Sequence, residues 1–161
     1  MKIAIGIPNT GTIKSHTAFC LCRALKDFPY EYDVLFKEGS ILHWNRESLA
    51  KKAIELGATH LLYLDADMSF DKDAIARLIK RDKDIIGGAY NLRRIPSVTT
   101  VKSSKPLGKG KLVTCDAVGT GFMLVKTDVF KKLSHPWFFW ESDDKGDVVT
   151  GEDYWFCRKA R

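Results

Sequence analysis

Two aspartates, Asp65 and Asp67, end an apolar run of strand length that starts at Thr59. Side chains alternate faces along a strand, so carboxylates two positions apart can lean to the same side as the chain leaves the sheet. Such carboxylates repel each other and lose hydration unless a cation or a hydrogen-bonded ligand compensates. Oxygen ligands of this kind suit hard divalent ions such as Mg²⁺ or Mn²⁺, which substrate phosphates often share. The pattern therefore predicts a metal-diphosphate site.

The same Asp-x-Asp spacing occurs twice more, so the triplet by itself is weak evidence. At Asp71 and Asp73 it opens a helical apolar pattern, and we expect those carboxylates to point to nearly opposite sides as helix-dipole partners. At Asp82 and Asp84 it falls in a polar turn. Only the pair that begins at Asp65 follows a strand, and the plainer interpretation of that pair, turn and cap residues, stays open here.

Length and composition bound the class of protein. A chain of 161 residues is enough for one domain with a real core, and too short to expect two. No stretch is long enough to span a bilayer, and the apolar start over residues 1–8 is too short for a signal peptide. The four cysteines lack zinc-ribbon or redox spacing, so we expect free thiols in a reducing compartment. Together these features predict a cytoplasmic protein.

The net charge of +6 is compatible with nucleic acid, an acidic membrane surface or a phosphate-bearing substrate. Basic residues are densest at Arg93 and Arg94 and over residues 102–111, within a segment typical of a loop or weak hairpin. A solvated loop and a contact with an anionic ligand are both open interpretations of this segment.

The first half of the chain predicts a mostly parallel, Rossmann-like sheet flanked by helices. We expect strands over 2–8, 32–36 and 61–64, separated by a helix capped by Ser15 and a helix over 46–56 capped by Asn45. A β-α-β-α-β order implies parallel strands with right-handed crossovers. Ligands of such sheets bind beyond the carboxyl ends of the strands, so residues 8–12, 38–46 and 65–67 should line one rim. Motifs of dinucleotide dehydrogenases and P-loop enzymes are absent from the sequence.

The second half predicts a small antiparallel addition to this sheet. Strands are expected over 85–90 and 122–126, with strands over 97–101 and 111–118 flanking the basic loop. Helices are expected over 73–80 and 128–133 and from residue 152 onward. The aromatic segment 136–140 is either core or one wall of a pocket, where rings can stack on sugars or bases. The acidic segment 141–150 is predicted to be mobile.

These motifs together resemble an inverting glycosyltransferase of the GT-A fold, in the large glycosyltransferase family 2-like group of cellulose- and spore-coat-type enzymes. The segment Pro8, Asn9 and Thr10 resembles the first-strand end that holds the nucleobase. Arg46 resembles a basic residue near the nucleotide. In the family's Asp-x-Asp the second aspartate binds the metal, and the first touches ribose or metal, which are the positions of Asp67 and Asp65.

The resemblance continues to the end of the chain. Gly121 lies in a segment that resembles the donor-sugar and acceptor segment, and Glu152 with Asp153 resembles the Glu-Asp motif whose aspartate is the catalytic base. Arg93 or Arg94 could add charge toward the diphosphate from a loop. Enzymes of this group often supply a metal-binding histidine from beyond the Glu-Asp helix, and the sequence ends at Arg161. The resemblance therefore implies one domain over 1–161, either truncated at its C-terminus or a minimal member.

The activity implied by the resemblance is a metal-dependent, hexosyltransferase-type reaction. The donor would be a nucleotide-diphosphate sugar, with UDP favoured and GDP or dTDP open, and the acceptor a glycan or another hydroxyl compound. Mn²⁺ is favoured over Mg²⁺ as the divalent cation. A nucleic-acid partner is not expected on this reading.

Other classes of protein carry some of these features. A phosphatase of the haloacid-dehalogenase type has Asp-x-Asp after an apolar strand, with the first aspartate as nucleophile, although usually on its first strand. A nucleotidyltransferase would show a basic, glycine-rich first loop, and residues 8–12 contain no base. A non-catalytic nucleic-acid module would bind oligonucleotides in a salt-sensitive way without metal. A donor-binding but inactive transferase is the remaining alternative.

Overall fold

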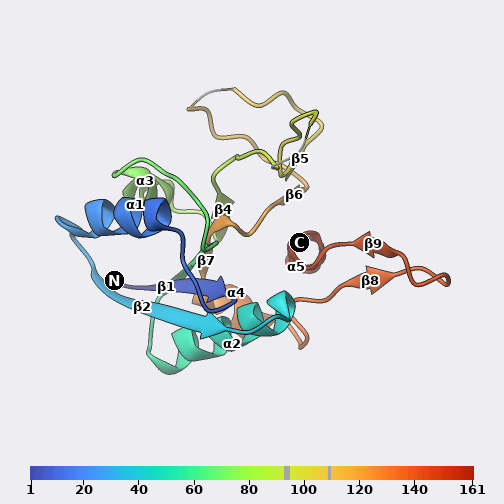
Figure 1. Ribbon diagram of the computed structural model, residues 1–161, viewed down its shortest axis with the longest axis horizontal. Helices are drawn as coiled ribbons and strands as arrows, with labels where there is room; N and C mark the ends of the chain where they lie inside the picture. The colour runs from blue at the N-terminus through green and yellow to red at the C-terminus, as the bar shows by residue number, and fades with distance from the viewer. Residues whose placement is uncertain (93–94, 109) are drawn as a thin grey trace.

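The computed structural model describes residues 1–92, 95–108 and 110–161. Its centre is a five-stranded sheet in the order β2-β1-β3-β7-β4, as Figure 1 shows. The strands are β1 (Lys2–Asn9), β2 (Glu31–Glu38), β3 (His60–Leu64), β4 (Ile85–Gly87) and β7 (Phe122–Lys126). β1 pairs in parallel with both β2 and β3, whereas β7 runs antiparallel to both β3 and β4. The prediction of a mixed α/β fold with a mostly parallel sheet is confirmed.

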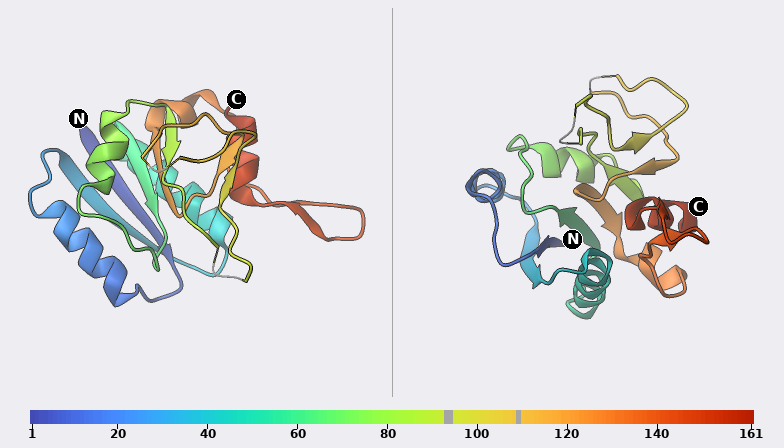
Figure 2. Two further views of the ribbon diagram at one scale, coloured as in Figure 1. Left: turned by 90° about the horizontal axis from the view of Figure 1, so that it is seen from above. Right: turned by 45° about the vertical axis from the view of Figure 1, so that its right-hand side comes forward.

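Helices cover both faces of the sheet (Figure 2). They are α1 (Ser15–Leu25), α2 (Leu42–Glu55), α3 (Ala74–Lys80), α4 (Thr127–Lys132) and α5 (Glu152–Lys159). Alternation along the strands divides the core: Leu62 and Leu64 pack with residues of α1 and α3, while Leu61 and Tyr63 pack with residues of α2, α4 and α5. Within the described part of the chain, no helix is long and apolar enough to cross a membrane.

The antiparallel addition differs from the prediction. β5 (Val101–Lys102) and β6 (Ala117–Val118) form a separate two-stranded sheet and are much shorter than the predicted strands. The antiparallel member of the central sheet is β7 instead. The predicted strand over 85–90 stops at Gly87, because the chain then turns and carries Tyr90 toward β7, where its hydroxyl contacts Gly121.

The acidic segment forms a hairpin that extends from the body of the molecule (Figure 1). Its strands are β8 (Glu141–Ser142) and β9 (Val148–Thr150). Two hydrogen bonds to the Asp143 carboxylate, from the backbone amides of Lys145 and Asp147, form the turn at 2.9 Å each. The segment that we predict to be mobile therefore has its own local turn chemistry.

Both predicted helix caps are wrong. Ser15 is already helical, Lys14 occupies the cap position, and Phe19 and Cys22 of this helix are exposed. α2 begins about one turn before Asn45, so this residue is within the helix and not at its cap. Its side chain donates through Nδ2 to the Gly39 carbonyl at 2.7 Å. Asn45 thus fixes the loop that precedes the helix. The cysteines are free thiols, as expected.

Candidate functional site

The carboxyl ends of three parallel strands share one rim, as predicted. The Gly39 amide, just after β2, donates to the Asn9 carbonyl at the end of β1 at 3.0 Å. Beyond β3, the Ala66 carbonyl accepts from the Lys14 amide at 2.8 Å and from Thr17 Oγ1 at 3.1 Å. The loops that follow β1, β2 and β3 are therefore tied together at the sheet edge where ligands of α/β proteins bind.

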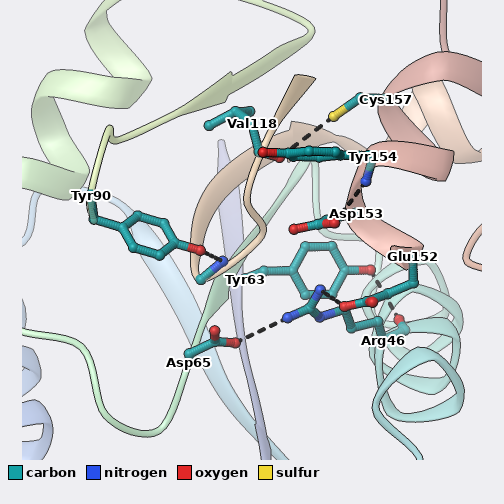
Figure 3. A network of polar contacts seen from close by, with 10 residues as sticks. Arg46, Tyr63, Asp65, Tyr90, Val118, Glu152, Asp153, Tyr154 and Cys157 are labelled. Carbon is teal, nitrogen blue, oxygen red and sulfur yellow. Dashed lines mark hydrogen bonds and ion pairs between the residues drawn. The ribbon is translucent and has the colours of Figure 1, made fainter. Parts of the chain in front are cut away.

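Arg46 is the centre of a buried ion-pair network on this rim (Figure 3). Its side chain is 3% exposed; Nη1 donates to Glu152 Oε1 at 2.5 Å and Nη2 to Asp65 Oδ1 at 3.2 Å. Arg46 comes from α2, Asp65 from the end of β3 and Glu152 from the first turn of α5. One guanidinium therefore joins three elements that are far apart in sequence.

The charges in this network shift one another. Burial lowers the pKa of Arg46, but the carboxylates of Asp65, Glu152 and Asp153 outweigh it and raise that pKa above its ordinary value. For Asp65, burial raises the pKa; Arg46 opposes this rise, and the charge of Asp67 adds to it. Three carboxylates thus surround one permanently charged arginine, and the acidic charge exceeds the basic charge at this place.

Asp153 lies next to this network at the start of α5. Its Oδ1 accepts a hydrogen bond from the Tyr154 amide at 2.8 Å. Burial raises the pKa of Asp153, and the charge of Glu152 raises it further, while Arg46 lowers it. In the view of Figure 3 its carboxylate lies between the rings of Tyr154 and Tyr63. A carboxyl group with a raised pKa is closer to the range in which it exchanges protons at neutral pH.

Asp67 follows in the bend after β3 and is half-buried. Its carbonyl oxygen lies 3.0 Å from His16 Nε2 of α1, which holds the bend against that helix. Its charge acts on Asp65, so the two predicted metal-binding carboxylates are close enough to interact. Among the described residues, no group of three or more acidic, histidine or cysteine side chains is arranged to hold a metal ion.

The other two Asp-x-Asp pairs are used in exposed ion pairs. Asp71 and Asp73 both bind the Arg77 guanidinium, at 3.0 and 2.8 Å, so the prediction that they point to nearly opposite sides is wrong. The reason is that α3 begins only after Asp73, which leaves both carboxylates in a turn that a long arginine can reach. Asp82 and Asp84 bind Lys126 in the same manner, at 2.9 and 3.2 Å.

Gly121 is a point of close approach between side chains. A Cβ atom there would lie 2.5 Å from the Tyr90 hydroxyl and 2.8 Å from Asp65 Oδ2. The Tyr90 hydroxyl accepts from the Gly121 amide at 2.8 Å, and the Asp65 amide donates to the Gly121 carbonyl at 2.9 Å. Burial, followed by the charge of Asp65, raises the pKa of Tyr90 to about 12. Only a glycine lets Asp65 and Tyr90 lie against this backbone.

The predicted nucleobase segment lies at the end of β1. Pro8 is buried, Asn9 is half-buried and Thr10 is exposed. Asn9 Oδ1 accepts from the Gly11 amide at 2.9 Å, so this side chain shapes its own turn. Arg93 and Arg94, the predicted loop arginines, lie outside the described residues.

The sequence did not predict two residues that make buried polar contacts near the rim, Tyr90 and Glu47. The sequence predicts Tyr90 only as the last residue of a strand, and no local pattern indicates that its hydroxyl reaches Gly121. Glu47 is buried on α2 and accepts hydrogen bonds from the backbone amides of Trp137 and Phe138. Its position just before the apolar residues Leu49, Ala50 and Ala53 of α2 is a usable signal, because buried acidic residues need partners.

A cavity of about 460 Å³ lies between β4, β6 and the end of α5. Asp65, Asp67 and Asp153 do not line it. The carboxylates of the rim therefore lie outside this cavity.

Comparison with known proteins gives a fold likeness only. No family model matches the chain, and no curated protein matches it. Among solved structures, the chain is similar to the crystal structure of A197 from STIV, a viral protein, at 21% identity and a TM-score of 0.69. The alignment covers 99% of this chain and 78% of A197. At this identity the similarity shows that the two chains share an α/β fold.

Proposed function

We propose that this protein is a glycosyltransferase of the GT-A fold that transfers a sugar from a nucleotide-diphosphate donor to a hydroxyl acceptor with inversion. The observation that carries the proposal is the joining of Asp65 and Glu152 by Arg46. This network brings the Asp-x-Asp end of β3 and the Glu-Asp start of α5 to one rim. Those are the two motifs that the resemblance assigns to metal-diphosphate binding and to the catalytic base.

The rim residues fit a divalent cation of the Mn²⁺ or Mg²⁺ kind. Asp65 and Asp67 offer hard oxygen ligands, and their mutual repulsion is the unfavourable term that a cation would relieve. These two aspartates would hold the ion, with Asp67 as its principal ligand. When bound, the ion supplies Lewis-acid stabilisation of the departing diphosphate.

The protein's own residues then have separate tasks. Arg46 opposes the rise in the pKa of Asp65 and holds its carboxylate in place through Nη2, while Nη1 of the same guanidinium binds Glu152. Asp153 takes the proton of the acceptor hydroxyl while the oxygen of that hydroxyl forms a bond to the anomeric carbon. The bond from that carbon to the diphosphate oxygen breaks, and its electron pair leaves with the nucleoside diphosphate. One displacement of this kind inverts the configuration.

The first experiment measures thermal stability against UDP, GDP, dTDP and CMP, each with Mn²⁺ or EDTA. A ligand at about a hundred times its dissociation constant stabilises by roughly 2.7 kcal/mol, which raises the melting temperature measurably. We expect one nucleoside diphosphate to stabilise the wild type only with metal, and Asp67→Asn to abolish this. Asp73→Asn is the matched control, because Asp73 has the same spacing but an exposed ion pair with Arg77.

Stabilisation by no nucleotide, or equal stabilisation of Asp67→Asn, would contradict the proposal. The second measurement separates a transferase from an inactive donor-binding protein. Release of nucleoside diphosphate from the matching nucleotide sugar should be measurable in the wild type and lost in Asp153→Asn, while nucleotide-induced stabilisation persists. Binding without any release in the wild type would indicate the inactive alternative.

A further inference from the structure

The structure has a second hollow, of about 680 Å³. Its volume lies within the roughly 300–1,000 Å³ that small-molecule sites occupy. One wall is the first half of α2 and the other is the segment 135–139. We call it the aromatic groove; the lining residues used below are His43, Trp44, Ser48, Lys51, His135 and Phe139.

The groove is a built feature, because a buried carboxylate joins its two walls. Glu47 of α2 accepts from the backbone amides of Trp137 and Phe138, the latter at 3.3 Å, and its Oε2 lies 3.3 Å from His135 Nδ1. The Glu47 side chain is only 12% exposed. The segment 135–138 is therefore fixed against α2 by several hydrogen bonds to one charged group, which makes the groove a pre-formed site.

Large aromatic rings are exposed along this groove. Trp44 is 63% exposed, and Phe139 and the neighbouring Trp140 are each 44% exposed. The ring of His43, which lines the groove, lies 6.4 Å from that of Trp140, centre to centre. Several exposed aromatic residues around one hollow are unusual on a protein surface and indicate a binding site.

The groove combines aromatic faces with hydrogen-bonding groups. His43, Ser48, Lys51 and His135 supply donors or acceptors among the rings. Sugar rings have the complementary surface, with apolar C–H faces for stacking and hydroxyl groups around the edge. A single-stranded nucleic acid would also stack, but it needs several cations along its backbone, and here Lys51 is accompanied by the acidic Glu47.

The groove is linked to the proposed reaction site by one neighbour in sequence and one ring contact. Glu47, which fixes it, follows Arg46 directly in α2. On the other side, the ring of Phe139 lies 5.2 Å from the ring of Trp155, two residues beyond Asp153 in α5. We infer that the aromatic groove binds a carbohydrate acceptor and presents its hydroxyl to Asp153. The acceptor role rests on the proposed function, whereas carbohydrate binding in the groove can be tested without it.

The test measures binding of four trisaccharides, maltotriose, cellotriose, mannotriose and chitotriose, by saturation-transfer NMR and tryptophan fluorescence titration. The proteins are the wild type, Trp44→Ala and Phe36→Ala. Phe36 is the matched control, because it is 60% exposed but lies on β2 and does not line the groove. We expect at least one trisaccharide to bind the wild type and Phe36→Ala equally, and Trp44→Ala about tenfold more weakly because a stacking face is lost.

Absence of binding by all four trisaccharides would overturn the inference, and so would binding that Trp44→Ala leaves unchanged. A Trp44-dependent rise of apparent mass with protein concentration, without sugar binding, would assign the groove to a second copy of the chain. Oligonucleotide binding lost in Trp44→Ala, again without sugar binding, would assign it to nucleic acid. The thermal stability of Trp44→Ala with nucleotide separates the two proposals. If a nucleoside diphosphate still stabilises this variant while no trisaccharide binds the wild type, the groove inference fails and the proposed function stands.

Discussion

Arg46 Nη2 lies 3.2 Å from Asp65 Oδ1, and this contact joins a helix on one face of the sheet to the end of its central strand. The arginine is almost completely buried, and its other terminal nitrogen binds Glu152. Buried charges persist only where their partners are fixed, so the positions of β3, α2 and α5 are mutually dependent. The rim is thus held by electrostatics as well as by the apolar core beneath it.

Replacing Arg46 should therefore be far more damaging than replacing an exposed arginine. Arg46→Met leaves Glu152, whose side chain is 8% exposed, without its cation. We expect a loss of about 3–5 kcal/mol in the free energy of unfolding, measured by urea denaturation. Arg77→Met is the control, since Arg77 also binds two carboxylates but is 56% exposed, and it should lose at most about 1 kcal/mol. Equal losses in the two variants would contradict this account.

The raised pKa of Asp153 has a consequence for stability against pH. Because burial and Glu152 raise the pKa, the folded state holds this proton more tightly than the unfolded state does. Stability therefore falls as pH rises from the ordinary Asp pKa, about 3.9, through the higher pKa of Asp153 in the folded state. Asp153→Asn removes this contribution. Measured in EDTA, the free energy of unfolding of the variant should therefore rise relative to that of the wild type over the same pH range.

Asp128→Asn provides a control of opposite sign. The hydrogen bond from Lys131 lowers the pKa of Asp128, so the ionised form stabilises the folded state above the ordinary carboxyl pKa. That variant should lose stability relative to the wild type as pH rises. If both variants changed in the same direction, the environment assigned to Asp153 would be wrong.

The contact between Tyr90 and Gly121 predicts a severe effect of a small substitution. Gly121→Ala would place a methyl group 2.5 Å from the Tyr90 hydroxyl and 2.8 Å from Asp65 Oδ2. We expect a loss of about 1–3 kcal/mol from overpacking, measured by denaturation, and weaker metal-dependent nucleotide stabilisation because Asp65 must move. Gly146→Ala, in the hairpin turn with φ of 85° and open space around it, should lose stability through backbone strain but keep nucleotide binding. Unchanged nucleotide binding in Gly121→Ala would show that Asp65 takes no part in it.

Much of the framework could be predicted because it depends on local pattern. Ile3 and Ile5 alternate with smaller residues along β1, and Leu61 to Leu64 form a short apolar run; such patterns specify buried strands with little help from the rest of the chain. The meeting of the strand ends at one rim then follows from right-handed crossovers. This is why the Asp65 rim was predicted while its detailed contacts were not.

The features that were missed depend on contacts between distant residues. Asn45 has the chemistry of a helix cap, but its partner, Gly39, lies in the preceding loop and the helix starts earlier. The chain leaves β4 before Tyr90, because the Tyr90 hydroxyl binds the Gly121 amide, 31 residues further along. Side-chain contacts of this kind override local propensity, and one sequence carries no signal for them.

Glu47 should be one of the most sensitive positions in the chain, because its carboxylate accepts hydrogen bonds from two buried backbone amides. Glu47→Ala leaves the amides of Trp137 and Phe138 without an acceptor and opens space beneath the aromatic segment. We expect a loss of about 3 kcal/mol or more in the free energy of unfolding, since each hydrogen bond to a charged group contributes about 1.5–3 kcal/mol. Glu55→Ala, on the same helix but 63% exposed and paired with the exposed Lys52, should stay within about 0.5 kcal/mol of the wild type. A small effect at Glu47 would mean that segment 135–138 is held by its apolar packing alone, and that the carboxylate is free for another role.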